Sequence, residues 1–282
     1  MVSLVVPGSS ERMLAKARSV SVDEIVIDLE DAVASERKPA ALTAALEALA
    51  AGGFSAARVS VRVNGIETEW AEAELSALSR APSPPAAIIL PKASQGAIEQ
   101  AAAAIRADSP IQLQALIETA DGLLSIEQAA AAARGRLEAL VIGYADLAVS
   151  LGRTPAGAQS LELWLAVQDR VLTAARANGL RAIDGPFLSL DDQAGLERSA
   201  TRAAQLGFDD KWAIHPAQIE PIRNAFAPTE PEVEDARAVI EALEAAQRNG
   251  AGAARLAGRM LDEPVRLAAL RTLARAEGTI DR

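Results

Sequence analysis

The stretch that decides the fold is IQLQALIETADGLLSIEQAAAAARGRLEALVIGYAD, residues 111–146. It begins with an apolar run over 111–118, continues through an Ala-rich segment with helical spacing over 121–134, and returns to a second apolar run over 137–146. Short apolar runs of this kind, bounded by polar residues, are typical of buried strands. A strand, a helix and a strand in this order predict a βαβ unit, whose two strands lie parallel.

The same alternation recurs along most of the chain. The candidate strands are residues 3–7, 24–30, 58–64, 86–92, 111–118, 137–146, 181–185 and 211–216. The candidate helices between them include residues 34–51, 97–107, 121–134, 160–178 and 191–206. Eight such repeats favour an α/β fold of the (β/α)8, or TIM-barrel, type. The alternative is an open, doubly wound sheet, but no GxGxxG motif follows the first strand.

The C-terminal part departs from this pattern, so we divide the chain into a barrel over 1–226 and a C-terminal helical extension over 227–282. A helix is expected after Thr229, which resembles a cap, and ends before Gly250. Residues 251–264 are interpreted as a Gly-rich loop, and residues 265–278 as a final helix. The extension either packs on the outside of the barrel or reaches a neighbouring subunit.

Composition excludes several kinds of chemistry. The chain has a formal charge of −10, no Cys and one His, His215. Disulfides, thiolate catalysis and Cys-type zinc sites are therefore excluded, and any metal must be held by oxygen atoms, which suit Mg²⁺ or Mn²⁺. The acidic balance argues against a nucleic-acid partner. His215 is interpreted as structural or as shaping a nucleotide pocket.

The N-terminus reaches Pro7 and charged residues too early for a signal peptide, and no apolar run is long enough to cross a bilayer. We therefore expect a cytoplasmic protein without a membrane partner.

Two carboxylates end neighbouring candidate strands. Glu118 follows the apolar run LQALI, and Asp146 follows VIGYA. A carboxylate at the end of a buried strand is costly unless it is paired or bound to a cation. Because adjacent parallel strands lie about 5 Å apart, one small cation could bridge the two acids. The alternative is that each acid caps the helix that follows it.

Other charged residues fall at the same ends of the strands. Arg62 offers a planar fork for a carboxylate or carbonyl oxygen, or forms an ion pair with Asp28 or Glu30. Glu30 is expected to face the site as a partner of Arg62 or of a metal-bound water. Asp31 is expected to form a salt bridge with Lys38.

The sequence resembles the citrate lyase β-subunit-like group within the HpcH/HpaI aldolase family. The matching segments, in chain order, are VPGSSERMLAKA, VIDLEDAV, VRVNG, ILPKA, ALIETADGL, GYADLAVSLG, AIDGPF, LGFDDKWAIHPAQI and GRMLDEP. The resemblance implies a (β/α)8 barrel, a homotrimer, and a site that holds Mg²⁺ and acts on a CoA-type thioester.

The resemblance also implies roles for individual residues. Glu118 and Asp146 become the magnesium ligands, with Glu118 also close to substrate, and Arg62 binds the keto-acid fragment and stabilises its enolate. Asp262 matches an acid that related enzymes deliver from a neighbouring subunit as a general acid/base. Lys16 and Lys92 are candidate contacts for the CoA phosphates, or else ordinary solvated charges.

The expected function is a Mg²⁺-dependent carbon–carbon lyase. It would cleave a 3-hydroxy-carboxyacyl thioester, such as a citryl-, malyl- or citramalyl-CoA, into an acyl-CoA and a 2-oxo acid. The alternatives are an acyl-CoA thioesterase, a malate-synthase-like condensing enzyme, or a citrate lyase complex subunit acting on an acyl-carrier protein. A non-catalytic scaffold is a further alternative, which the charged strand ends disfavour.

Overall fold

The computed structural model of this chain describes residues 1–277 and divides into two compact units. The first unit is Met1–Arg223 and the second begins at Asn224. This division falls three residues before the expected boundary at 226. No helix among the described residues is long and apolar enough to cross a membrane.

The first unit is a closed barrel of eight parallel strands in chain order. The strands are β1 Val2–Pro7, β2 Glu24–Asp28, β3 Arg58–Arg62, β4 Ala87–Leu90, β5 Gln112–Ile117, β6 Leu137–Ile142, β7 Arg181–Asp184 and β8 Asp210–Ala213. Each predicted strand overlaps one of them, and the barrel is closed where β1 pairs with β8. The predicted fold is therefore confirmed, and the open-sheet alternative is wrong.

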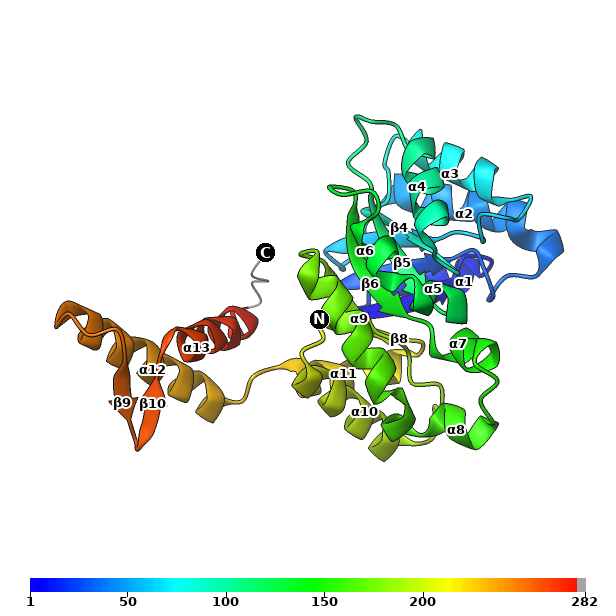
Figure 1. Ribbon diagram of the computed structural model, residues 1–282. Coiled ribbons are helices and arrows are strands. Elements are labelled where there is room, and N and C mark those ends of the chain that lie inside the picture. The colour runs from blue at the N-terminus through cyan, green and yellow to red at the C-terminus, as the bar shows by residue number, and fades with distance from the viewer. Residues whose placement is uncertain (278–282) are drawn as a thin grey trace. The chain divides into compact units, whose positions relative to one another are not determined.

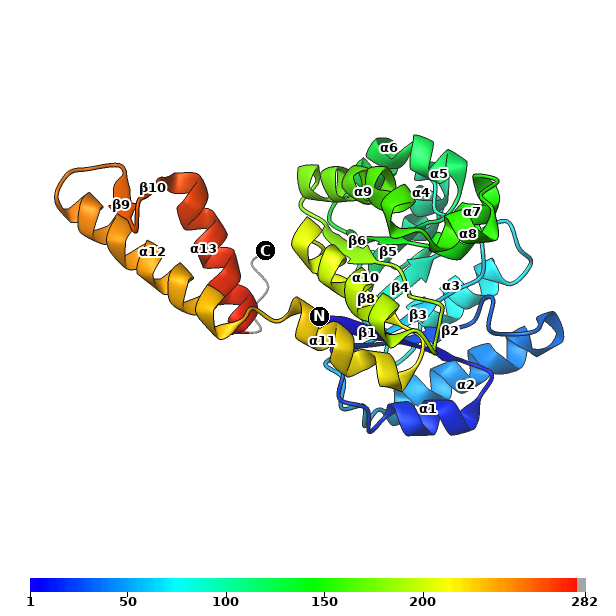
Figure 2. The same ribbon diagram turned by 90° about the horizontal axis from the view of Figure 1, so that it is seen from below.

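Helices surround these strands (Figures 1 and 2). They are α1 Glu11–Ala17, α2 Lys38–Ala51, α3 Ala71–Ser79, α4 Gln95–Ala104, α5 Ala120–Leu124, α6 Ile126–Ala131, α7 Tyr144–Ser150, α8 Pro155–Gln159, α9 Leu165–Ala177, α10 Gln193–Leu206 and α11 Ile219–Phe226. Short 3₁₀ segments occur at Ser35–Arg37, Leu161–Trp164 and Pro216–Gln218.

The single helix predicted over 121–134 is two helices, α5 and α6. They are separated at Ser125, whose hydroxyl bonds to the carbonyl oxygen of Asp121 at 2.8 Å. A serine side chain that competes for a helix carbonyl in this way weakens the regular ladder.

The core forms where strands and Ala-rich helices pack closely. One buried cluster joins residues of several strands: Val26, Ile89, Leu116, Ala139, Val141, Ile183 and Trp212. On α2, Ala41, Ala45 and Ala48 are all buried. Small side chains at this spacing let a helix approach the barrel closely, which accounts for the abundance of alanine.

The second unit contains α12 Glu230–Arg248, a hairpin of β9 Ala254–Leu256 and β10 Arg259–Leu261, and α13 Glu263–Ala276. The prediction of a loop over 251–264 is therefore wrong in part. Ala257 and Gly258 both have positive φ, 48° and 82°, as a two-residue hairpin turn of the primed type requires. The expected end of the last helix, at 278, lies outside the described residues.

Candidate active site

Glu118 lies at the mouth of the barrel, directly after β5. Glu118 is 1% exposed, and its Oε1 accepts a hydrogen bond from the backbone N–H of Lys92 at 2.7 Å. Gly143, directly after β6, makes room for it, because a Cβ on Gly143 would lie 2.5 Å from Cβ and Oε2 of Glu118. The residues that follow the two neighbouring strands therefore accommodate this carboxylate, one by a hydrogen bond and the other by its lack of a side chain.

Asp146 stands in the first turn of α7, half-buried. No hydrogen bond or ion pair to its carboxylate is found within residues 1–277. Its negative charge nonetheless helps to raise the pKa of Glu118, so the two acids lie close together. The structure thus brings together the two residues expected to hold a metal.

Glu118 does not cap the helix that follows it. Thr119 caps α5 by accepting from the N–H of Gly122 at 3.0 Å, and α7 begins after Gly143 without a side-chain cap. The capping alternative is therefore wrong for Glu118. Asp146 lies in a first turn, where a negative charge is favourable, but it does not act as the cap.

Arg62, at the end of β3, is held by two carboxylates of the neighbouring strand end. Its Nε and Nη2 donate to Asp28 Oδ1 and Oδ2, both at 2.7 Å, and its Nη1 lies 2.8 Å from Glu30 Oε2. Burial opposes the charge of Arg62, but the hydrogen bonds to Asp28 and the negative charges of Asp28 and Glu30 raise its pKa overall. A guanidinium has five N–H groups, so two remain for a substrate oxygen.

Glu30 joins Arg62 to Lys92. Its Oε1 lies 3.2 Å from Nζ of Lys92. Burial raises the pKa of Glu30, while the charges of Arg62 and Lys92 oppose that shift. Lys92 itself has φ of 48°, a left-handed conformation that is strained in a residue with a side chain. This conformation allows its backbone to bind Glu118 while its side chain binds Glu30.

The mouth carries more negative than positive charge. Five carboxylates (Asp28, Glu30, Asp31, Glu118 and Asp146) stand against two cations, Arg62 and Lys92, which leaves three formal charges unbalanced. Glu118 shows the consequence, because burial and then the charge of Glu30 raise its pKa to about 8. A cation bound here would reverse that shift, because it favours the ionised carboxylate.

Lys38 does not pair with Asp31, so that prediction is wrong. Its Nζ donates to the carbonyl oxygens of Leu29 and Glu30, at 3.1 and 3.0 Å, and to Oδ1 of Asn64 at 2.5 Å. Asp31 instead lies 3.6 Å from Arg62. Two backbone carbonyls of the turn after β2 and the Asn64 side chain therefore take up all three ammonium hydrogens.

Sequence reasoning missed one supporting residue here, Glu74, and gave another, Lys38, the wrong partner. Glu74 of α3 accepts from the backbone and side-chain N–H groups of Asn64, at 2.7 and 2.5 Å. A signal was present, since Glu74 shares the buried face of α3 with Ala71, Leu75 and Leu78. No comparable signal predicts the acceptors of Lys38, because it lies in a charged stretch at the start of a helix.

Two other expected residues, Lys16 and His215, do not join this group, and a third, Asp262, is described within its own unit. Lys16 is exposed in the last turn of α1. This end of the helix lies next to the segment that leads into β3, so Lys16 lies toward the end of the barrel opposite the carboxylates. His215 caps a short 3₁₀ segment through Nδ1, which accepts from Ala217 at 3.2 Å, in keeping with a structural role. Asp262 belongs to the second unit, where it caps α13.

The donor set at the mouth suits a hard divalent cation. No group of three or more His or acidic side chains that could hold a metal occurs within the described part of the chain. Magnesium commonly takes one or two protein carboxylates and keeps water and substrate oxygens in its other positions. Glu118 and Asp146 fit that pattern, and the raised pKa of Glu118 indicates a carboxylate that gains from a cation.

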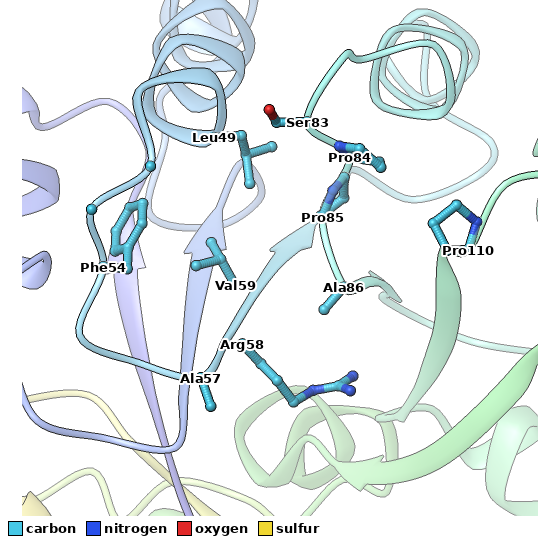
Figure 3. Close-up of a pocket in the computed structure, with 12 residues that line it drawn as sticks. Leu49, Phe54, Ala57, Arg58, Val59, Ser83, Pro84, Pro85, Ala86 and Pro110 are labelled. Carbon is cyan, nitrogen blue, oxygen red and sulfur yellow. The ribbon is translucent and has the colours of Figure 1, made fainter.

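A hollow of about 390 Å³ lies at the other end of the barrel (Figure 3). Its lining includes Phe54, Ala57 and Val59 around the start of β3, and Ala86 just before β4. Catalytic groups in barrels of this type gather where the strands end, so the carboxylate cluster is the better candidate site.

Comparison with known proteins gives consistent matches. A family profile described as HpcH/HpaI aldolase/citrate lyase matches residues 2–216. A (3S)-malyl-CoA thioesterase of Cereibacter sphaeroides is 39% identical over 275 residues, which cover 97% of this chain and 93% of the thioesterase. An L-malyl-CoA/β-methylmalyl-CoA lyase of the same organism is 31% identical over 280 residues and covers 91% of this chain and 88% of the lyase.

One solved structure extends the comparison to ligands. CitE of Mycobacterium tuberculosis, crystallised in complex with magnesium, acetoacetate and coenzyme A, is 32% identical, with a TM-score of 0.80. The match covers 98% of this chain and 97% of CitE.

Proposed function

This chain belongs to the HpcH/HpaI aldolase/citrate lyase family, and from that premise we propose that it is a Mg²⁺-dependent carbon–carbon lyase. Its substrate would be a malyl-CoA-like thioester, that is, a 3-hydroxyacyl-CoA that carries a second carboxylate. The products would be an acyl-CoA and a 2-oxo acid. The malyl-CoA lyase relative supports the substrate class, and the magnesium and coenzyme A bound by CitE support the cofactor and the thioester.

The observation that carries this proposal is a buried carboxylate at the mouth, Glu118, with other acids as close neighbours. Glu118 is 1% exposed, is crowded by Glu30 and Asp146, and has its pKa raised to about 8. A buried carboxylate with one hydrogen bond and other acids nearby is costly to ionise, so a fold that retains one is suited to a bound cation. Bound there, Mg²⁺ would polarise the carbonyl of the oxo-acid fragment and so ease cleavage.

The side chains have distinct parts in the cleavage. When a base removes the β-hydroxyl proton, the oxygen forms a carbonyl, the Cα–Cβ bond breaks, and its electron pair moves to the thioester as an enolate. Arg62 would bind the carboxylate fragment with its two remaining N–H groups and balance the developing charge. Asp28 and Glu30 would hold the guanidinium plane in place.

The enolate carbon must then take a proton. We assign this step to Asp262, delivered by a neighbouring subunit of a homotrimer, as the family resemblance implies. A CoA-phosphate contact at Lys92 and a cytoplasmic location stay predictions. Lys16 is a weaker candidate for the CoA phosphates, because it lies toward the other end of the barrel.

Hydrolysis of the same thioester is the second candidate. The thioesterase relative is 39% identical, against 31% for the lyase relative, and both are named for malyl-CoA. The two reactions share the need to bind a malyl-CoA-like ester, but they release different products. Hydrolysis would yield free CoA and the hydroxy acid, with no carbon–carbon cleavage.

A product assay separates the two. Purified protein is incubated with malyl-CoA or citramalyl-CoA, with Mg²⁺ or with excess EDTA, and 2-oxo acid and free thiol are measured in parallel. We expect release of 2-oxo acid that EDTA abolishes. Free thiol without 2-oxo acid would identify a thioesterase, and full activity in EDTA would refute the magnesium site.

A further inference from the structure

A buried polar network lies next to the start of α7. The hydroxyl of Tyr144 donates to Oδ1 of Asp184 and accepts from Nε2 of Gln168 at 2.8 Å. The second carboxylate oxygen of Asp184 accepts from Nζ of Lys211 at 2.6 Å. Lys211 also donates to the carbonyl oxygen of Gly185 at 2.7 Å. The network therefore joins β7 and β8 to α7 and α9.

This network is costly as a device for stability alone. Lys211 and Asp184 are both 0% exposed, and a buried ion pair gains little over apolar residues of the same shape. What the pair does supply is a fixed acceptor, since Lys211 holds the Asp184 carboxylate in one orientation. Tyr144, on α7, donates its hydroxyl to this acceptor.

The start of α7 depends on Tyr144 more than a typical helix start would. Gly143 precedes the helix without a side-chain cap, so the first turn has no anchor of the usual kind. The Tyr144 ring packs edge-on against Trp164, with centroids 4.9 Å apart. Gly185 leaves space for it, because a Cβ there would lie 2.8 Å from the ring.

Asp146 stands in this same first turn, two residues after Tyr144. We propose that Tyr144, held by the Asp184–Lys211 pair, is a positioning residue that sets the Asp146 carboxylate for metal binding. This inference rests on the proposed function, because it takes Asp146 as a magnesium ligand. Supporting residues of this kind commonly change metal affinity by about 10- to 100-fold when they are lost.

The chain offers a matched control at the opposite end of the barrel. Ser60 donates its hydroxyl to Oε1 of Glu24, another buried hydroxyl–carboxylate hydrogen bond. Ser60→Ala and Tyr144→Phe therefore each remove one buried hydroxyl bonded to a carboxylate. Only Tyr144 shares a helix turn with Asp146, so only its loss should weaken the metal.

The test is Mg²⁺ binding, measured by calorimetry and by the rise in melting temperature of the intact chain. Tyr144→Phe should raise the Kd for Mg²⁺ roughly 10-fold, and excess Mg²⁺ should restore its kcat. Ser60→Ala should bind Mg²⁺ like the wild type, even if it melts at a lower temperature. Gln168→Leu, which removes the donor to the Tyr144 hydroxyl and a longer contact of 3.5 Å with Asp184 but keeps the bond from Tyr144 to Asp184, should weaken binding in the same direction by less.

The outcomes separate this proposal from the proposed function. If the wild type binds Mg²⁺ and Tyr144→Phe binds it equally well, the positioning role is wrong and the metal site stands. If Tyr144→Phe does not fold, an unchanged Kd in Gln168→Leu overturns the role instead. If the wild type itself binds no Mg²⁺, the proposed function fails, and this inference fails with it.

Discussion

Two buried carboxylates at opposite ends of the barrel, Glu24 and Glu118, differ in how far the protein satisfies them. At the floor, where the strands begin, Glu24 accepts from Ser60, from Gln114 at 3.1 Å and from Ser3 at 3.3 Å. Glu138 there accepts from Arg58 and from Arg181, the latter at 3.0 Å. At the mouth, Glu118 accepts one hydrogen bond within the described residues, from the backbone of Lys92.

This difference separates carboxylates that build the fold from those that are held ready for a ligand. A buried acid whose oxygens are filled by hydroxyl, amide and guanidinium groups is satisfied by the protein itself. A buried acid left with other acids as neighbours is satisfied only when something else binds. β2 carries two acids of the first kind, Glu24 at its start and Asp28 at its end, where Arg62 and backbone N–H groups fill both oxygens of Asp28. Glu118 is of the second kind.

The largest expected effect comes from removing the mouth acids. Glu118→Ala should lower Mg²⁺-dependent turnover by about 10³-fold or more, because the cation loses a ligand. Without Mg²⁺ at pH 8 and above, its melting temperature should match or exceed that of the wild type, since a carboxylate whose ionisation is unfavourable there is gone. Asp146→Ala should lose turnover in the same way. Normal activity in both variants would show that the cluster is not the site.

Removing Glu24 at the floor should lower stability and leave Mg²⁺ binding unchanged. Glu24→Ala removes the acceptor of Ser60 and one of the two carboxylates that accept from Gln114, so the free energy of unfolding should fall by about 2–4 kcal/mol. Its Kd for Mg²⁺ should not change. Denaturant unfolding and calorimetry measure the two quantities. The control is Glu47→Ala on the exposed face of α2, which should change stability by less than about 0.5 kcal/mol.

The smallest effect concerns pH. In EDTA, Glu118 stays protonated in the folded state up to about pH 8, whereas its ordinary pKa is 4.5. The folded state therefore binds more protons between these values, and the free energy of unfolding falls as pH rises through them. In Glu118→Gln this fall should be shallower, and at pH 8 the variant should melt several degrees higher, at about 2–4 °C per kcal/mol.

The pH effect is read as the difference between the two proteins. Burial also raises the pKa of Glu30, Glu74 and Asp210, so both proteins lose stability as pH rises. Adding Mg²⁺ should remove the difference at pH 8, because the cation stabilises only the wild type. If the melting temperatures of the two proteins in EDTA change equally with pH, Glu118 ionises normally.

Much of the site could be predicted because parallel strands all end on one side of a barrel. Glu118, Asp146, Arg62 and Glu30 each follow an apolar run, and topology alone brings such residues to a common rim. Lys92 was expected there too, but its two contacts were not, since they depend on a left-handed backbone at one residue. Contacts of long side chains, such as Lys38 with three separate acceptors, have no local pattern in the chain.

By itself, the amino-acid sequence determined the alternation of strands and helices, the closed barrel and the end at which its charges gather. These follow from periodicity and chain order, which are local properties. Only the tertiary structure decided which buried acids find partners. Whether a carboxylate is satisfied depends on groups dozens of residues away, such as Gln114 for Glu24, and on the space that a glycine such as Gly143 leaves for Glu118.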